Sequence, residues 1–158
     1  MSRTLAILAA LAGLSLGGCM HQTDVAGLGW TYQDDTGEGP KLAYGAPQSD
    51  NIVMMMTCQP GGRTVNLSLL GGSPHERLTL ASNGSRQAFP ATASDHPGDG
   101  FMVEADAPLA AGPLAQFEQT GRLTLISRGR SAPLDAAPAE RAQVERFFEA
   151  CRAESAVA

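Results

Sequence analysis

The sequence predicts a mainly β protein, an antiparallel β-sandwich or small barrel with one C-terminal amphipathic helix. Three observations support this prediction. Short runs of alternating apolar and polar residues recur along the chain, separated by glycine, proline and asparagine. Only 5% of the residues are aromatic and 18 are glycines, which is typical of a turn-rich sandwich or barrel. Near the C-terminus the apolar spacing changes from a period of two to the helical period.

The domain should begin with short strands at residues 30–33 and 41–44, with a polar turn at 34–37 between them. The strongest strand candidate is 51–58, because it is largely apolar on both faces. One face carries Ile52, Met54, Met56 and Cys58, and the other carries Val53, Met55 and Thr57. This pattern predicts a strand that is covered on both sides and lies centrally in the sheet.

A first hairpin is expected to join 51–58 to residues 63–70 through the turn Pro60-Gly61-Gly62. The second of these strands alternates cleanly between apolar and polar residues. Its inward side chains should be Val65, Leu67 and Leu69, and its outward ones Thr64, Asn66 and Ser68. The alternation predicts one buried and one exposed face.

A second hairpin is indicated by Asn83-Gly84, a pair that favours a tight turn between two strands. Leu78 and Leu80 mark the strand before the turn, and residues 85–89 should form the returning strand. Residues 91–100 are rich in small and polar side chains, so we expect a loop there.

The next segments are short. Residues 101–105 alternate as a strand, and 113–119 should form one or two helical turns that end at Gly121. The last clear strand candidate is 122–127. Together these elements complete the β-rich body of the domain.

The C-terminal helix is predicted at 138–153. Its apolar stripe follows the i, i+3, i+4, i+7 spacing and consists of Val144, Phe147, Phe148 and Cys151. Asp135 is the expected N-cap, and Pro138 suits the first turn, where backbone N–H groups have no partner within the helix. The stripe should pack on the sheet and bring Cys151 near Cys58.

The N-terminus has the three parts of a secretory signal: Arg3, an apolar segment at 5–16, and two small residues. The apolar segment is shorter than the roughly 20 residues that cross a bilayer. The run Leu16-Gly17-Gly18-Cys19 resembles the lipobox of bacterial lipoproteins. The resemblance implies that residues 1–18 are removed as a signal peptide and that Cys19 carries a diacylglyceryl group; the alternative is an ordinary cleaved signal with a chance cysteine.

The same resemblance implies a location. Met20 follows the cysteine where an aspartate would signal retention in the inner membrane, which implies an outer-membrane anchor facing the periplasm. Inner-membrane retention stays open as the alternative. Residues 19–29 would form a lipidated tether, and 30–158 a single β-rich domain of a size that can build its own core. The membrane, contacted through acylated Cys19, is therefore an expected partner.

The chain is acidic, with 11 basic and 16 acidic residues and a net charge of −5. Loss of Arg3 with the signal peptide leaves ten basic residues against sixteen acidic, a net charge of −6. This balance disfavours a nucleic-acid partner, which requires clustered positive charge. Arg122, Arg128 and Arg130 form a small basic group, interpreted as solubilising charge at strand ends.

Cys58 and Cys151 are the two cysteines left after lipidation of Cys19. An oxidising periplasm favours a disulfide between them. A bridge across so long a loop would contribute about 4 to 5 kcal/mol by the chain-entropy model. A pair of buried thiols or a single catalytic thiol is the alternative, although no histidine lies near either cysteine in sequence.

No catalytic motif is found in the mature sequence. The hydrolase pattern G-x-S-x-G occurs at 13–17, inside the signal peptide. The acidic pair at 34–35 precedes Thr36-Gly37, where short polar residues favour a turn. We therefore assign no catalytic residue and no cofactor.

No metal site is predicted either. The run Met54-Met55-Met56 contains soft copper ligands, but consecutive strand side chains point to opposite faces, so it is interpreted as core packing. His21, His75 and His96 are scattered over the tether and loops. Residues 95–100 resemble a calcium loop only in Asp95, Asp99 and Gly100 and are interpreted as a turn.

These observations favour a lipid-anchored cell-envelope protein that acts as a non-enzymatic binding or assembly module for an envelope protein, a glycan or a small apolar ligand. An assembly subunit would pair through an exposed edge strand. A small envelope hydrolase is an alternative, in which His75 or His96 would meet a serine and an acid in a pocket.

A periplasmic inhibitor of a cell-wall hydrolase is a further alternative. Residues 56–67 resemble the strand, cysteine, glycine turn and strand of membrane-bound lysozyme-inhibitor lipoproteins. That resemblance implies lysozyme as the partner. The stretch nearest to the Ser-Gly-x-x-Tyr motif associated with those inhibitors is Asn83-Gly84-Ser85-Arg86, which contains no tyrosine.

Overall fold

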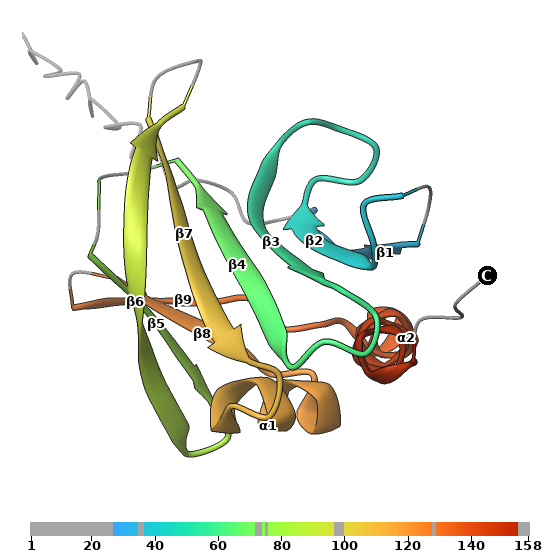
Figure 1. The fold of residues 1–158 in the computed structure, drawn as a ribbon. Helices are drawn as coiled ribbons and strands as arrows, with labels where there is room; N and C mark the ends of the chain where they lie inside the picture. The colour runs from blue at the N-terminus through green and yellow to red at the C-terminus, as the bar shows by residue number, and fades with distance from the viewer. Residues whose placement is uncertain are drawn as a thin grey trace, which may run out of the picture.

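The protein is a single curled β-sheet that packs around two helices (Figure 1). The structure is a computed structural model that describes residues 27–34, 37–71, 74, 76–96, 100–127 and 129–154. The strands are β1 (Gly29–Gln33), β2 (Lys41–Gly45), β3 (Ile52–Cys58), β4 (Thr64–Leu70), β5 (Arg77–Ser82), β6 (Ser85–Asp95), β7 (Phe101–Pro108), β8 (Thr124–Ser127) and β9 (Arg130–Pro133). The helices are α1 (Gly112–Thr120), the short 3₁₀ helix η1 (Pro138–Glu140) and α2 (Arg141–Arg152).

All neighbouring strands of the sheet are antiparallel, in the order β1-β2-β3-β4-β7-β6-β5-β8-β9. Figure 1 shows the sheet curling into a half-barrel, with β8 and β9 running behind β6 and β7. The predicted class, mainly β with a C-terminal helix, is confirmed. The half-barrel has two edges, β1 and β9, in the described part of the chain.

The inner face of the sheet and the two helices form one apolar core. Helix α1 packs on β5 and β6, and α2 packs on β1 and β2. Trp30 of β1 lies against Tyr44 of β2 and Phe117 of α1, with ring centroids 5.1 and 5.0 Å apart. Phe117 in turn meets Phe148 of α2. The predicted stripe Val144, Phe147, Phe148 and Cys151 is buried, which confirms the amphipathic helix.

Trp30 links the two edges of the sheet, because it joins β1 to the chain that follows β9. Its indole N–H donates a hydrogen bond of 2.8 Å to the carbonyl oxygen of Leu134, which follows β9. The edge of β1 is further covered by α2, because the backbone N–H of Tyr32 donates to the Gln143 side chain at 2.9 Å. This contact shields the β1 edge from pairing with another strand.

A disulfide joins Cys58, at the end of β3, to Cys151, in the last turn of α2. Their Cα atoms lie 5.7 Å apart, and 93 positions separate them in the sequence. The backbone reinforces this junction, because the N–H of Gly61 donates to the carbonyl oxygen of Cys151 at 2.9 Å. The predicted pairing is present, and it fixes the end of α2 against the turn between β3 and β4.

Strand β3 differs in part from its predicted environment. Met54, Met56 and Cys58 are buried in the core, as expected for one face. Val53 and Met55 on the other face are only half-buried, since both helices pack on the inner side of the sheet. The prediction of a strand fully covered on both sides is therefore wrong, although β3 does lie inside the sheet, between β2 and β4. The alternation of the methionines between faces agrees with a packing role.

The first half of segment 91–100, which was expected to be a loop, is strand. β6 runs to Asp95, and its second part pairs with β7 from Ala91 opposite Ala105 onward. Its first part pairs with β5, so the strand changes partners at Pro90, a residue with no N–H to donate. The small side chains of this part show no strong apolar alternation, and pairing with β7 decides its conformation.

One strand was missed and one predicted helix cap is wrong. Strand β9 was not predicted because all four of its residues are exposed, so its sequence has no alternation of buried and exposed positions. Asp135 does not cap the C-terminal helix; its Oδ1 accepts the backbone N–H of Leu123 at 3.0 Å. The helix entry uses Glu140 instead, whose Oε2 accepts the Ala137 N–H at 2.9 Å.

Both turn predictions based on glycine are confirmed. Asn83 and Gly84 form the β5–β6 turn with φ of 41° and 82°, a left-handed pair that suits a two-residue hairpin. Gly121 ends α1 with φ of 69°, and its N–H donates to the Phe117 carbonyl oxygen. Cys19, the predicted signal peptide and most of the predicted tether lie outside the described residues. No helix in the described part is long and apolar enough to cross a membrane.

Candidate functional site

A depression lies where β7, α1 and the end of α2 meet, and we call it the α1–α2 groove. Its volume is about 570 Å³. The lining residues are Arg63, Pro108, Leu109, Ala110, Ala115, Glu118 and Arg152. Four of them are apolar and three are charged, a mixture typical of a site for a small ligand with an apolar body.

Backbone hydrogen bonds shape the groove. The N–H of Leu109 donates to the carbonyl oxygen of Arg63 at 2.7 Å, which holds the turn after β7 against the start of β4. The N–H of Ala111 donates to the Pro108 carbonyl oxygen at 2.8 Å and directs the chain into α1. Leu109 is half-buried against the core. The apolar surface of the groove therefore lies between Arg63 on one side and the charged pair of Glu118 and Arg152 on the other.

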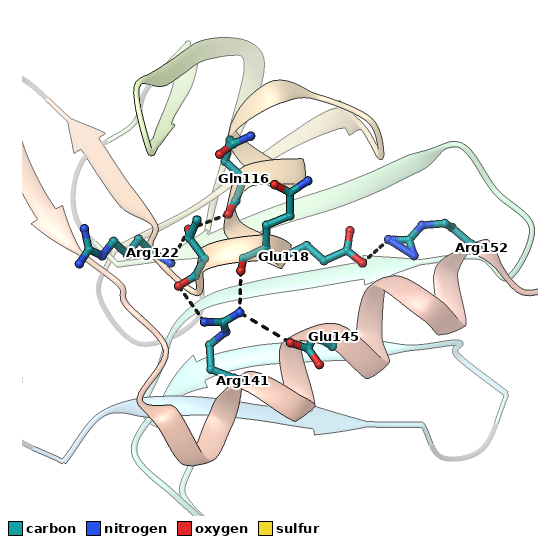
Figure 2. A network of polar contacts seen from close by, with 8 residues as sticks. Gln116, Glu118, Arg122, Arg141, Glu145 and Arg152 are labelled. Atoms are coloured by element: carbon teal, nitrogen blue, oxygen red, sulfur yellow. Dashed lines mark hydrogen bonds and ion pairs between the residues drawn. The ribbon is translucent and has the colours of Figure 1, made fainter.

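One wall is an ion pair between Glu118 of α1 and Arg152 of α2 (Figure 2). Hydrogen bonding to the Glu118 carboxylate raises the pKa of Arg152 above its usual range. Arg152 follows Cys151, so the disulfide fixes the backbone that carries this guanidinium. On this side of the groove the two opposite charges neutralise each other, and the disulfide holds the backbone next to Arg152 in place.

Arg141 joins α1 to α2 at the far end of the same contact. Its guanidinium donates to the carbonyl oxygens of Gln119 and Thr120, at 2.6 and 3.1 Å, and lies 3.6 Å from Glu145 (Figure 2). A cation is favourable here because the last carbonyls of a helix have no partner within it. With Arg141 at one end and the disulfide at the other, the two helices present a preformed groove.

Arg63 is the charged group of the groove that is left free. It is exposed, and it forms no ion pair with any carboxylate in the part of the chain that the structure describes. A guanidinium offers several donors in a planar fork that matches a carboxylate. The groove thus combines an apolar floor with one cation available to an anionic ligand group.

The α1–α2 groove has a larger volume than two other depressions of the described surface. A depression on the outer face of β1 and β2 measures about 270 Å³, below the roughly 300 to 1,000 Å³ of small-molecule sites. Another, of about 450 Å³, lies on the outer face of β5 and β8 and is lined mainly by polar groups, including Arg86 and Arg122. The α1–α2 groove is the larger and the more apolar of these sites.

The residues singled out in the sequence are not gathered at this groove. Cys58 and Cys151 lie behind it and support it, while Cys19, His21 and His75 lie outside the described residues. No hydrogen bond joins the His96 side chain to a described serine or acid, and no cluster of three or more possible metal ligands occurs in the described part. The segment 56–67 belongs to the β3–β4 hairpin, and its proposed role in inhibition stays a prediction.

Sequence reasoning missed the groove because its walls come from distant segments. Arg63, Leu109, Glu118 and Arg152 belong to four separate parts of the chain, and none stands in a motif. The neighbouring Cys151 was the only available signal, since a predicted bridge to Cys58 also brings Arg152 toward the β3–β4 turn.

The fold and the groove define a disulfide-braced β half-barrel with a ligand-sized groove between two helices. Comparison with protein-family models, with curated proteins and with solved structures finds no significant match for this chain. The function is therefore argued from the groove itself.

Proposed function

We propose that this protein is a lipid-anchored binding module of the cell envelope that holds a small ligand with an apolar body and a carboxylate in the α1–α2 groove. Cys19 supplies the anchor, and the groove supplies the binding site. The observation that carries the proposal is the placement of a free guanidinium, Arg63, beside the apolar surface of Leu109 and Ala115. The apolar part of the ligand would cover that surface while its carboxylate pairs with Arg63.

The energetics agree with a reversible binder. Burial of apolar area contributes roughly 25 cal/mol per Å², so a short hydrocarbon chain gains several kcal/mol before the cost of ordering it. Arg63 lies in solvent, which weakens its attraction to a carboxylate. Apolar burial is therefore the main source of affinity, and Arg63 contributes orientation and preference for an acid.

Photocrosslinking tests the proposal on the full-length protein in detergent. The probes are a diazirine-bearing fatty acid and the fatty alcohol of the same length. We expect the acid to label peptides that contain Leu109 and Ala115, and the alcohol to label them less. Labelling spread evenly over the surface, or equal labelling by both probes, would contradict the assignment.

Variants sharpen the test. Ala115→Phe should fill the groove and reduce labelling by the acid at least tenfold, while Ala88→Phe on the outer face of β6 should leave it unchanged. Arg63→Gln should weaken labelling by the acid about threefold to tenfold and leave the alcohol unaffected. Arg146→Gln on the exposed side of α2 is the matched control for charge.

A further inference from the structure

Positive charge is strongly segregated in this acidic chain. Residues 77–90 and 122–133 contain five of the eleven basic residues and none of the sixteen acidic ones. These two segments lie side by side, because β5 pairs with both β6 and β8, and β8 pairs with β9. The folded sheet therefore places a basic arm at one end of a molecule that is otherwise strongly negative.

The cross-strand register shows which side chains share the outer face of this arm. Leu78, Leu80 and Leu125 point into the core, so the alternate residues of β5 and β8 point outward. Arg77 lies on that outward row, and Arg86 is paired with Ala81 on it. Arg122 and Arg86 line the same depression, of about 450 Å³. Arg130, at the start of β9, is exposed but pairs with Ser127, which shares the inward row of β8 with Leu125, so Arg130 lies on the opposite side of the arm.

We call Arg77, Arg86 and Arg122 the arginine face. None of the three forms an ion pair with a carboxylate in the described part. Arg77 donates to the carbonyl oxygen of Ala88 at 3.3 Å, and the other two side chains have no hydrogen-bond partner there. Two acids lie nearby: Glu76 precedes β5, and Asp135 lines the depression while its Oδ1 accepts the Leu123 N–H.

We infer that the arginine face docks on the phosphate groups of an anionic lipid surface and so orients the anchored domain on its membrane. Guanidinium groups pair well with phosphate oxygens, because their planar fork of N–H donors matches the phosphate geometry. The occupant is assigned from charge complementarity. This inference rests on the proposed lipid anchor, which keeps the domain near the membrane.

Two features make docking through this arm specific. Ten positions separate Cys19 from the start of β1 at Gly29, and a chain of ten residues spans at most about 36 Å. The domain therefore stays within reach of the headgroups. The chain outside residues 77–90 and 122–133 carries all sixteen acidic residues and only six of the eleven basic ones, so anionic lipid repels it, and the arginine face is the surface that turns toward the membrane.

The test uses the full-length lipidated protein reconstituted in two kinds of vesicle, phosphatidylcholine alone and phosphatidylcholine mixed with phosphatidylglycerol. Amide hydrogen exchange is measured over residues 77–90 and 122–133. We expect slower exchange in these segments on the anionic vesicles only, and loss of that protection at high salt. Equal exchange on both vesicles would overturn the inference.

The double variant Arg86→Gln/Arg122→Gln removes the two exposed charges of the face that line the depression. It should remove the protection, since each arginine near an anionic surface changes the docking equilibrium about fivefold. Lys41→Gln/Arg146→Gln removes the same charge from other surfaces and should leave the protection intact. Protection that persists in the first variant would show that another surface docks and would overturn the inference.

Flotation of the same vesicles separates this inference from the proposed anchor. Protein that fails to float even with neutral vesicles has no lipid anchor, and the proposed function then fails first. Protein that floats with both vesicles but shows no protection retains the anchor and contradicts docking alone. Protection that requires an added acidic envelope protein instead of lipid would overturn the membrane assignment.

Discussion

The Trp30 side chain connects three parts of the fold: β2, α1 and the chain that follows β9. It is almost fully buried, it contacts aromatic rings of β2 and α1, and its indole N–H satisfies the Leu134 carbonyl oxygen after β9. A buried carbonyl without a partner costs about 1 to 3 kcal/mol, so this hydrogen bond opposes separation of the two ends of the curled sheet.

Tyr32, on the same strand, supports a prediction about pH. Burial, followed by a hydrogen bond with Asp34 and the negative charge of that residue, raises the pKa of Tyr32 to about 12. The unfolded chain releases this proton near pH 10, so the contribution of Tyr32 to stability is complete below about pH 10 and is lost as pH rises toward 12.

Ultraviolet absorbance of the phenolate measures this directly, because Tyr32 and Tyr44 are the two tyrosines of the chain. Burial also raises the pKa of Tyr44. We expect the native protein to show no tyrosine titrating in the ordinary range, and Tyr32→Phe to remove one step near pH 12. A native step at the ordinary tyrosine pKa that disappears in Tyr32→Phe would contradict this assignment.

At the scale of elements, the disulfide and α2 act together. The helix contributes Phe147 and Phe148 to the core, and Cys151 ties its last turn to β3. Without the bridge, the end of α2 would be held by the partly exposed Arg152 ion pair and by the Gly61 hydrogen bond. Exposed ion pairs contribute little to stability, so the covalent link dominates here.

Cys151→Ser should therefore destabilise the oxidised protein by about 4 to 5 kcal/mol, the chain-entropy value for a loop of this length. Urea unfolding in oxidising and reducing buffer is the measurement. The parent should unfold at lower urea in reductant, whereas the variant should show similar midpoints in both buffers, and Cys58→Ser should behave in the same way. A parent midpoint independent of reductant would refute the role of the bridge.

At the scale of the whole molecule, the half-barrel separates two surfaces. The α1–α2 groove lies beside the disulfide, and the arginine face lies on the β5-β8-β9 end of the sheet. The β9 edge is short and ends in Pro133, which removes one N–H and so limits pairing with another strand. Assembly through a long exposed edge is thus not favoured, and the two surfaces are the better candidates for binding.

The anchor is also tested on the whole molecule. Cys19→Ser should move the protein from the membrane fraction to the soluble fraction, because Cys19 is the attachment point that the lipobox resemblance implies. Cell fractionation and immunoblotting are the measurement. Cys58→Ser is the control for loss of a cysteine elsewhere: it breaks the disulfide but keeps Cys19, so the protein should stay at the membrane. Continued membrane retention of the Cys19 variant would refute the lipid anchor.

Local pattern was enough for the features that depend on neighbouring residues. The apolar stripe of α2, the inward row of β4, the Asn83-Gly84 turn and the Gly121 end of α1 all follow from spacing and backbone preference, and the structure confirms each. The exposed outer face predicted for β4 is wrong at Ser68, which is buried. The pairing of Cys58 with Cys151 was predictable because only two cysteines remain beyond Cys19.

Tertiary structure alone decided the features that depend on distant partners. The second half of β6 is a strand because β7 pairs with it, and Asp135 accepts the Leu123 N–H because β8 begins beside it. Curling of the sheet brings Trp30 to Leu134 and gathers Arg63, Leu109 and Arg152 into one groove. Period and composition describe neighbours along a chain, whereas a groove or a charged face arises from residues that meet only after the sheet has closed around its helices.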